Sequence, residues 1–207
     1  MKRLSKRLRI PQTSQEEYLK ECGFEVVCGV DEVGRGSWAG SLVAGAVILS
    51  RRLYGLRDSK LLSSKEREKL SSKIKRSSIW GIGEVSASDI DKIGLSKATQ
   101  LAFKRAISKL RKPDFVLADG FKFLSPIPCR ALKKGDMTCS SIAAASIIAK
   151  VYRDQLMRRL DKDIKGYYFS KHKGYGTKLH QNRIAKLGPS LEHRKSYLPI
   201  KKALSNR

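Results

Sequence analysis

Short apolar stretches rich in β-branched residues recur along the chain, and glycine, proline or charged residues bound them. This pattern is typical of β-strands. It predicts strands at 24–30, 42–49, 79–85, 114–118 and 130–133. The glycine-rich connection between the first two stretches favours an antiparallel pair.

Apolar residues at helical spacing predict helices between and after these strands. One helix spans 86–110 and ends before Pro113. Another follows Ser63, which forms the pattern of a capping box with Glu66, and continues to about residue 75.

The stretch 140–160 is the clearest helix, and its small residues, AAAS, allow close packing on a sheet. Two further helical stretches lie near 177–187 and 193–204. The order of strands and helices predicts an α/β fold with extra helices at its C-terminal end.

Basic residues dominate the charge and are unevenly placed. The 207 residues include 44 Lys and Arg against 19 Asp and Glu, a net charge of +25. Such a surface attracts phosphate backbones, so we favour a nucleic-acid partner over an anionic membrane or an acidic protein. We expect a basic N-terminal tail at 1–22 and one domain at 23–207, with a helical basic lobe at about 165–207.

The remaining composition disfavours several classes of protein. The four cysteines lack the short pairing of a zinc site and the three histidines are far apart in sequence, so we expect free thiols in a reducing compartment. No apolar run approaches the roughly 20 residues of a membrane span, and no apolar segment of a signal peptide follows the basic N-terminus. We therefore expect a cytoplasmic protein with no membrane partner.

Acidic residues are scarce, yet they follow apolar strands at Asp31-Glu32, Asp119 and Asp136. Active sites of α/β sheets collect at the C-terminal ends of strands. Carboxylates gathered there repel one another unless a cation neutralises them, and oxygen ligands suit Mg²⁺ or Mn²⁺. A lone acid at a strand end is more often a turn former or a helix cap. Three such places in a basic chain favour a metal-dependent phosphodiesterase.

The pair Asp31-Glu32 carries a geometric condition. Adjacent strand residues point to opposite faces, so both carboxylates can serve one site only where the strand ends or twists. The glycine-rich turn that follows them favours such an ending.

Seven motifs follow one another in order along the chain. They are GVDEVGRG at 29–36, DSK at 58–60, ADG at 118–120, KGD at 134–136, SIAAASIIAKVYRD at 141–154, HKGYGT at 172–177 and HRKSY at 193–197. This series resembles the type 2 ribonucleases H, in particular bacterial ribonuclease HII, from about residue 24 to the C-terminus. The resemblance implies a ribonuclease H-like fold, a mixed five-stranded sheet flanked by helices with a helical C-terminal extension.

The resemblance also implies an activity. The family cleaves the RNA strand of RNA–DNA hybrids and cuts at single ribonucleotides embedded in duplex DNA, leaving 3′-hydroxyl and 5′-phosphate ends. Its catalytic, metal-binding carboxylates map to Asp31, Glu32, Asp119 and Asp136, with Mn²⁺ or Mg²⁺ as cofactor. In our hypothesis Asp31 bridges two ions, Glu32 and Asp119 complete one site and Asp136 completes the other. Asp154 lies in a family-like stretch and is expected to have a supporting role. We expect a monomer, and no protein partner is indicated.

The loop Gly34-Arg35-Gly36 is expected to recognise ribose. Glycine lets backbone groups approach a sugar, and a 2′-hydroxyl both donates and accepts hydrogen bonds. An ordinary tight turn is the alternative. By resemblance Tyr175 stacks on a sugar near the cut, the alternative being a packed loop residue.

Basic residues near these motifs are candidate phosphate contacts. They are Lys60, Lys173 and Arg194, although any one of them could be solvated surface. His172 is expected to be structural or to contact phosphate rather than to transfer protons.

The chain departs from the family pattern at Ser37, Ser41 and Leu61, where the family often has proline, proline and lysine. These departures put the rigidity of the first loop in doubt. Two rivals stay open. A non-enzymatic RNA-binding protein would share the charge, and a junction resolvase would share the metal chemistry without needing a ribose-sensing loop.

Overall fold

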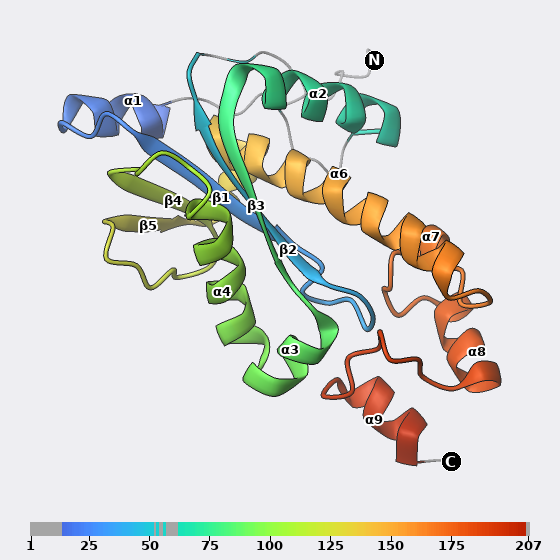
Figure 1. Ribbon diagram of the computed structural model, residues 1–207. Helices are drawn as coiled ribbons and strands as arrows, with labels where there is room; N and C mark the ends of the chain where they lie inside the picture. The colour runs from blue at the N-terminus through green and yellow to red at the C-terminus, as the bar shows by residue number, and fades with distance from the viewer. Residues whose placement is uncertain (1–13, 52, 54–55, 57–61, 206–207) are drawn as a thin grey trace, which may run out of the picture.

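One mixed sheet forms the centre of the protein (Figure 1). The computed structural model describes residues 14–51, 53, 56 and 62–205, and the strands within them form a five-stranded sheet of order β3-β2-β1-β4-β5. The strands are β1 (Val27–Val33), β2 (Leu42–Leu49), β3 (Ser78–Val85), β4 (Phe115–Asp119) and β5 (Cys129–Leu132). β2 is antiparallel to β1 and β3, whereas β4 is parallel to β1 and β5. The predicted fold class and the antiparallel first pair are confirmed.

Helices cover both faces of this sheet (Figure 1). Helix α4 (Leu95–Ile107) packs on one face, and α6 (Ser140–Asp163) with α2 (Ser64–Ser77) packs on the other. Because successive strand side chains point to opposite faces, β2 contributes to both cores. Ala44 faces the α4 side, and Val43 faces the α6 side.

Helix α6 lies close to the sheet because the facing residues are small. A Cβ atom on Gly45 of β2 would lie 2.3 Å from the carbonyl oxygen of Ala145. A Cβ atom on Gly29 of β1 would lie 2.2 Å from the carbonyl carbon of Ser141. The close packing predicted for the AAAS stretch is confirmed. It places the polar residues that follow this stretch on α6 beside the C-terminal end of β1.

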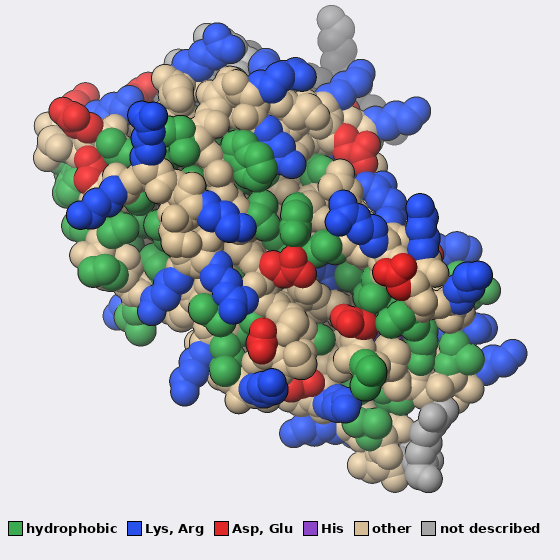
Figure 2. Space-filling view, in the orientation of Figure 1, with side chains coloured by type: hydrophobic (Ala, Val, Ile, Leu, Met, Phe, Trp, Pro, Cys, Tyr) green, Lys and Arg blue, Asp and Glu red, His purple; other side chains and the backbone are tan. Residues whose placement is uncertain are grey.

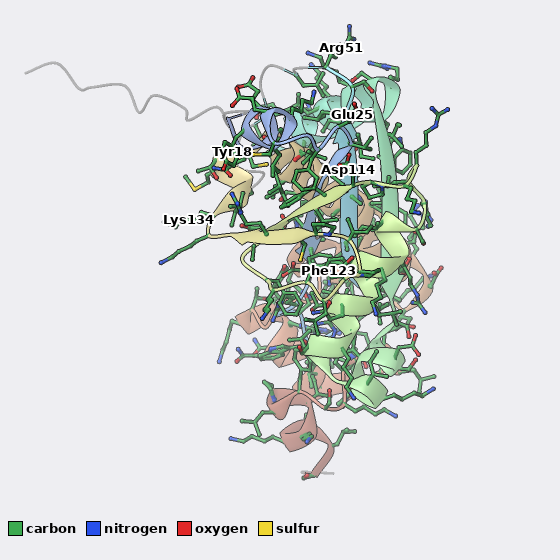
Figure 3. All side chains as sticks on the ribbon, turned by 90° about the vertical axis from the view of Figure 1, so that its left-hand side faces the viewer. Tyr18, Glu25, Arg51, Asp114, Phe123 and Lys134 are labelled. Atoms are coloured by element: carbon green, nitrogen blue, oxygen red, sulfur yellow. The ribbon has the colours of Figure 1, made fainter. Side chains whose placement is uncertain are left out.

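The start of the sheet is fastened by Asp114. Its carboxylate accepts hydrogen bonds from the backbone N–H of Glu25 at 2.7 Å and of Val26 at 3.0 Å. Figure 3 shows Asp114 beside Glu25, where β1 and β4 begin. This link aligns the two parallel strands, so their C-terminal ends reach the same edge of the sheet.

Helix α2 begins as predicted. Ser63 Oγ accepts from the N–H of Glu66 at 3.3 Å, and the Glu66 carboxylate accepts from the N–H of Ser63 at 2.8 Å. The helix predicted at 86–110 is instead two helices, α3 (Ala87–Ile93) and α4. Gly94, with φ of 80°, interrupts the helical backbone between them.

The segment 1–22, expected to be a basic tail, contains helix α1 (Ser14–Glu21) in its described part. Leu19 on this helix is buried against the first residues of β1 and β4, Val27 and Phe115. The Glu16 carboxylate accepts from the N–H of Ser141 at 2.9 Å. Apolar burial and this hydrogen bond hold α1 on the domain, so the prediction of a tail is wrong for the described part.

Short helices make up the C-terminal part of the chain. They are α7 (Phe169–His172), α8 (Lys178–Leu187) and α9 (Leu198–Ser205). The helix predicted at 193–204 begins only at Leu198, because 193–197 forms turns and an isolated bridge pairs His193 with Ala39.

Two further predictions concern cysteines and membranes. All four cysteines are free thiols, as expected. Among the described helices, none combines the length and the apolar character that crossing a membrane requires.

Candidate active site

Three of the four predicted carboxylates are positioned by strands. β1 continues through Asp31 and Glu32 and ends at Val33, and Asp119 is the last residue of β4. Asp136 was expected at a strand end, but it lies in the first turn of α5 (Gly135–Thr138). β5 ends at Leu132, and a left-handed residue, Lys134 with φ of 55°, turns the chain into that helix.

All four carboxylates open onto one hollow of about 410 Å³. The predicted ribose-reading loop and the predicted stacking tyrosine line the same hollow. Its lining residues are Asp31, Glu32, Val33, Gly34, Arg35, Gly36, Asp119, Asp136, Ser146, Lys150 and Tyr175. Asp31 and Glu32 thus share one site at the end of β1, which meets the geometric condition on adjacent strand residues.

Asp136 and Asp31 are the two most buried carboxylates of the site, with 5% and 8% of their surfaces exposed. Burial, followed by the nearby Glu32 charge, raises the pKa of Asp31 well above the usual value. A hydrogen bond from Ser146 and the N–H of Glu32, 2.7 Å from Asp31 Oδ1, oppose that rise. The site therefore holds a carboxylate whose ionised form is destabilised unless a cation is near.

Glu32 has one paired oxygen and one unpaired oxygen. Oε1 lies 3.5 Å from the Arg35 guanidinium, whereas Oε2 is buried and has no hydrogen-bond partner among the described residues. Burial raises the pKa of Glu32, the Arg35 charge lowers it and the Asp119 charge raises it. Asp119 in turn accepts from the N–H of Gly135 at 2.6 Å, which joins β4 to the helix that carries Asp136.

The carboxylates have the ligand chemistry that a divalent cation prefers, but they do not form a closed metal-binding cage. In the part of the chain that the structure describes, no group of three or more His, Cys, Asp or Glu side chains is arranged to hold a metal ion as it stands. However, a buried unpaired oxygen on Glu32 and mutually repelling carboxylates are the features that a hard cation relieves. The donor set therefore fits Mg²⁺ or Mn²⁺.

The glycine loop is held from the C-terminal side by Arg194 and Tyr197. The Arg35 carbonyl accepts from Arg194 Nη1 at 3.0 Å and from the Tyr197 hydroxyl at 2.5 Å. The Gly40 carbonyl accepts from Arg194 Nε at 3.1 Å and Nη2 at 2.9 Å. Arg194 is completely buried. Its predicted role as a phosphate contact is therefore wrong, because its donors are directed to loop carbonyls.

The two serines that depart from the family pattern are both hydrogen-bonded. Ser37 Oγ donates to the Lys173 carbonyl at 3.4 Å, and Ser41 Oγ donates to the Glu84 carboxylate at 2.7 Å. The loop is therefore held at both positions without the two prolines.

Lys173 is half-buried, and its ammonium donates to the carbonyl of Ser170. A phosphate contact by Lys173 thus stays a prediction that requires this side chain to turn outward. Lys60 lies outside the described residues, as does Leu61. Lys and Arg side chains are spread over the face shown in Figure 2 and outnumber the acids there.

Tyr175 borders the hollow and is 36% exposed. The three histidines, His172, His180 and His193, form a cluster next to the turn that carries it. The rings of His172 and His180 stack with centroids 4.1 Å apart, and His180 Nδ1 donates to the Tyr175 carbonyl at 3.0 Å. His172 is buried, and its Nε2 lies 2.8 Å from the Tyr167 carbonyl. His172 is thus structural, as expected.

Two polar lining residues were missed from the sequence, Ser146 and Lys150. Lys150 Nζ donates to Asp154 Oδ1 at 2.7 Å, so Asp154 contacts a residue that lines the hollow, and its supporting role stays a prediction. These residues recur at a spacing of four on α6, so a polar stripe among the small and apolar residues in the first part of this helix was the available signal.

Comparison with known proteins assigns the family. The family model described as Ribonuclease HII matches residues 28–198. A ribonuclease HII of Dehalococcoides mccartyi is 45% identical over 92% of this chain and 94% of its own length. One of Thermus thermophilus is 44% identical over 86% of this chain and 89% of its own. The chain belongs to the ribonuclease HII family.

The fold agrees with this assignment. The ribonuclease H2 of Pyrococcus horikoshii OT3 superposes with a TM-score of 0.73 at 24% identity, covering 88% of this chain and 98% of that one. The predicted resemblance to bacterial ribonuclease HII is thus confirmed, and so is the expectation of a ribonuclease H enzyme. In a ribonuclease HII chain, four carboxylates beside a glycine loop and an exposed tyrosine form the natural candidate for the active site.

Proposed function

We propose that this chain is an endonuclease that hydrolyses the RNA strand of RNA–DNA hybrids and cuts at single ribonucleotides embedded in duplex DNA. The products would carry 5′-phosphate and 3′-hydroxyl ends. One observation carries the proposal: four carboxylates, the loop Gly34-Arg35-Gly36 and Tyr175 line the same hollow. Family membership and the net charge of +25 support it.

Asp31, Glu32, Asp119 and Asp136 would hold Mg²⁺ or Mn²⁺. When bound, two such ions lower the pKa of the attacking water and stabilise the departing 3′-oxygen. Glu32 Oε2 is buried and has no protein donor among the described residues, so this oxygen is available to a cation.

The chain's other groups would bind and orient the substrate. Backbone groups of the glycine loop would contact the 2′-hydroxyl, which distinguishes ribose from deoxyribose. The Arg35 carbonyl is already engaged by Arg194 and Tyr197, so this reading would fall to the other backbone groups of the loop. The exposed ring of Tyr175 would stack on a neighbouring sugar, and surface Lys and Arg would contact phosphates.

Site-directed variants test the carboxylates. Asp31→Asn and Asp119→Asn keep the side-chain shape but remove the charge, so each should abolish cleavage with Mg²⁺ or Mn²⁺ on a duplex containing one ribonucleotide. Glu68→Gln is the matched control, because this carboxylate pairs with Arg158 on the surface, outside the hollow. Near-normal cleavage by either site variant would refute the metal assignment.

Three substrates separate the rivals. A duplex of DNA alone, an RNA–DNA hybrid and a duplex with one ribonucleotide are incubated with the unaltered chain. We expect cutting of the last two and none of the first. Cutting of DNA alone would indicate a resolvase-like nuclease, and binding without cutting would indicate an RNA-binding protein.

A further inference from the structure

Arg153 of α6 is a completely buried arginine whose guanidinium donates to backbone carbonyls. Nε donates to the Ser41 carbonyl at 2.9 Å, Nη1 to the Lys173 carbonyl at 2.9 Å and Nη2 to the Ala39 carbonyl at 3.3 Å. Burial lowers its pKa to about 10, so the group stays charged at neutral pH. A buried charge is costly, and its retention here calls for a role.

The carbonyls that Arg153 binds belong to two segments that both lead to the hollow. Ala39 and Ser41 follow the glycine loop, and Lys173 begins the turn that carries Tyr175. Lys173 has a left-handed backbone with φ of 54°, which is uncommon for a residue with a side chain. One planar cation therefore fixes how far the loop lies from the turn.

Arg153 also contacts both groups that would read the substrate. A Cβ atom on Gly34 would lie 2.2 Å from Arg153 Nε, so the guanidinium lies directly beneath this glycine. The Arg153 Cζ atom is 5.7 Å from the centroid of the Tyr175 ring, within the range of a cation–π contact. The ring remains partly exposed to the hollow.

We propose that Arg153 is a positioning residue that sets the spacing between the glycine loop and Tyr175, and that this spacing determines cutting at a lone ribonucleotide relative to a hybrid. The inference rests on the proposed function. A lone ribonucleotide offers one 2′-hydroxyl, so the loop and the tyrosine must engage at a single register. A hybrid offers a 2′-hydroxyl at every RNA position and an A-like shape. Its cleavage is therefore less sensitive to a displacement of the loop or the tyrosine.

Arg153→Lys keeps the charge but loses the planar fork that reaches both segments. We expect kcat/KM for the single-ribonucleotide duplex to fall at least about tenfold relative to that for the hybrid, since a displacement near 1 Å can reduce rates by about 10²-fold. The loss should appear mainly in kcat, because KM reflects phosphate contacts made by surface Lys and Arg, whereas Arg153 is completely buried.

Arg183→Lys is the matched control. Arg183 Nε donates to the Gly166 carbonyl at 2.5 Å, and its guanidinium lies 5.2 Å from the Tyr168 ring, so it makes the same kinds of contact away from the hollow. This variant should lose stability without changing the ratio of the two rates. A change of ratio in Arg183→Lys equal to that in Arg153→Lys would overturn the proposal.

A double-mutant cycle separates positioning from general damage. Tyr175→Ala is combined with Arg153→Lys, and kcat is measured on the single-ribonucleotide duplex. If Arg153 acts through Tyr175, the combined loss is smaller than the product of the two single losses. Independent losses that multiply would overturn the proposal.

The unaltered chain is assayed first. If it does not cut at a lone ribonucleotide, the proposed function itself fails. If it cuts and a folded Arg153→Lys keeps the same ratio of rates, only the role of Arg153 fails. If neither Arg153→Lys nor Arg153→Gln yields folded protein, Arg153 serves folding rather than selectivity, and the inference is likewise overturned.

Discussion

The Nε2 atoms of His180 and His193 lie 3.0 Å apart in the buried interior of the C-terminal part of the chain. Their other contacts fix the protons. The N–H of Ser190 donates to His193 Nδ1 at 2.9 Å, so the His193 proton is on Nε2 and is donated to His180. His180 then carries its proton on Nδ1 and donates it to the Tyr175 carbonyl. Both rings are neutral in this chain of hydrogen bonds.

This chain of hydrogen bonds predicts a pH dependence of stability. Burial lowers the pKa of His180 and of His193 to about 4, whereas an unfolded histidine has a pKa near 6.5. The unfolded state therefore binds more protons, and the free energy of unfolding should fall as pH decreases from about 6.5 through 4. Carbon–proton NMR correlations of the two rings should stay unshifted down to about pH 5, with Tm declining in the same window. Ring titration near pH 6.5 would contradict the neutral pair.

The three histidines illustrate which features the sequence conceals. His172, His180 and His193 were treated as unrelated because they are separated along the chain, and only the folding of α7, α8 and the following turns brings them together. The roles of Arg194 and Arg153 were concealed for the same reason. A basic residue in a basic chain suggests phosphate, and only the tertiary structure shows a guanidinium directed at carbonyls.

Local patterns, in contrast, predicted the sheet well and named most of the residues that line the hollow. Short apolar stretches placed the strands to within a few residues, and each of Asp31, Glu32 and Asp119 was found at the end of its strand. Asp136 was misplaced because Lys134 adopts a left-handed backbone, which residue type alone does not indicate. Helix α1 was missed because its charged residues outnumber the single apolar one that is buried, Leu19.

Gly34→Ala should weaken both stability and selectivity. Gly34 has φ of +93°, and a Cβ atom would lie 2.2 Å from Arg153 Nε, so alanine strains the backbone and displaces the guanidinium. We expect a loss of about 1–3 kcal/mol in the free energy of unfolding and weaker discrimination for ribose. Chemical denaturation and the two-substrate assay measure the two effects.

Two glycine variants serve as controls for that result. Gly23→Ala has the same positive φ but no atom within 4 Å of a Cβ, so it reports backbone strain alone. Gly36→Ala has open space around its Cβ and should leave the free energy of unfolding unchanged. Unchanged activity and selectivity in Gly34→Ala would argue against ribose recognition by the loop.

Asp31→Asn should stabilise the protein in metal-free buffer although it removes activity. Burial and the Glu32 charge raise the pKa of Asp31 in the folded state, so its stabilising contribution is present below the unfolded pKa and lost as pH rises through the folded pKa. At neutral pH the ionised carboxylate is therefore unfavourable, and asparagine removes that penalty. We expect Tm in EDTA to rise by roughly 2–4 °C, the shift for a change of about 1 kcal/mol in a domain of this size.

Metal addition and a control variant complete this test. Mn²⁺ or Mg²⁺ should raise the Tm of the unaltered chain more than that of Asp31→Asn, because binding stabilises the folded state only where the ligands are intact. Asp114→Asn should instead lower Tm, since its carboxylate accepts backbone N–H groups at the start of the sheet. A lower Tm for Asp31→Asn in EDTA would show that Asp31 is primarily structural.

Tyr175→Ala should slow cutting at a lone ribonucleotide, whereas Tyr175→Phe should retain it. The ring is partly exposed to the hollow and also contacts the Arg153 guanidinium. Stacking on a sugar uses the face of the ring, so it requires the ring rather than the hydroxyl. By analogy with aromatic stacking on nucleic acid, about 1–3 kcal/mol is at stake, which corresponds to a loss of at least about fivefold in single-turnover rate. Tyr168→Ala is the matched control, because this tyrosine is similarly exposed and contacts Lys171 and Arg183 outside the hollow. Equal rates for Tyr175→Ala and the unaltered chain would mean that Tyr175 only packs its loop. Recognition of the ribonucleotide would then rest on the backbone groups of the glycine loop alone.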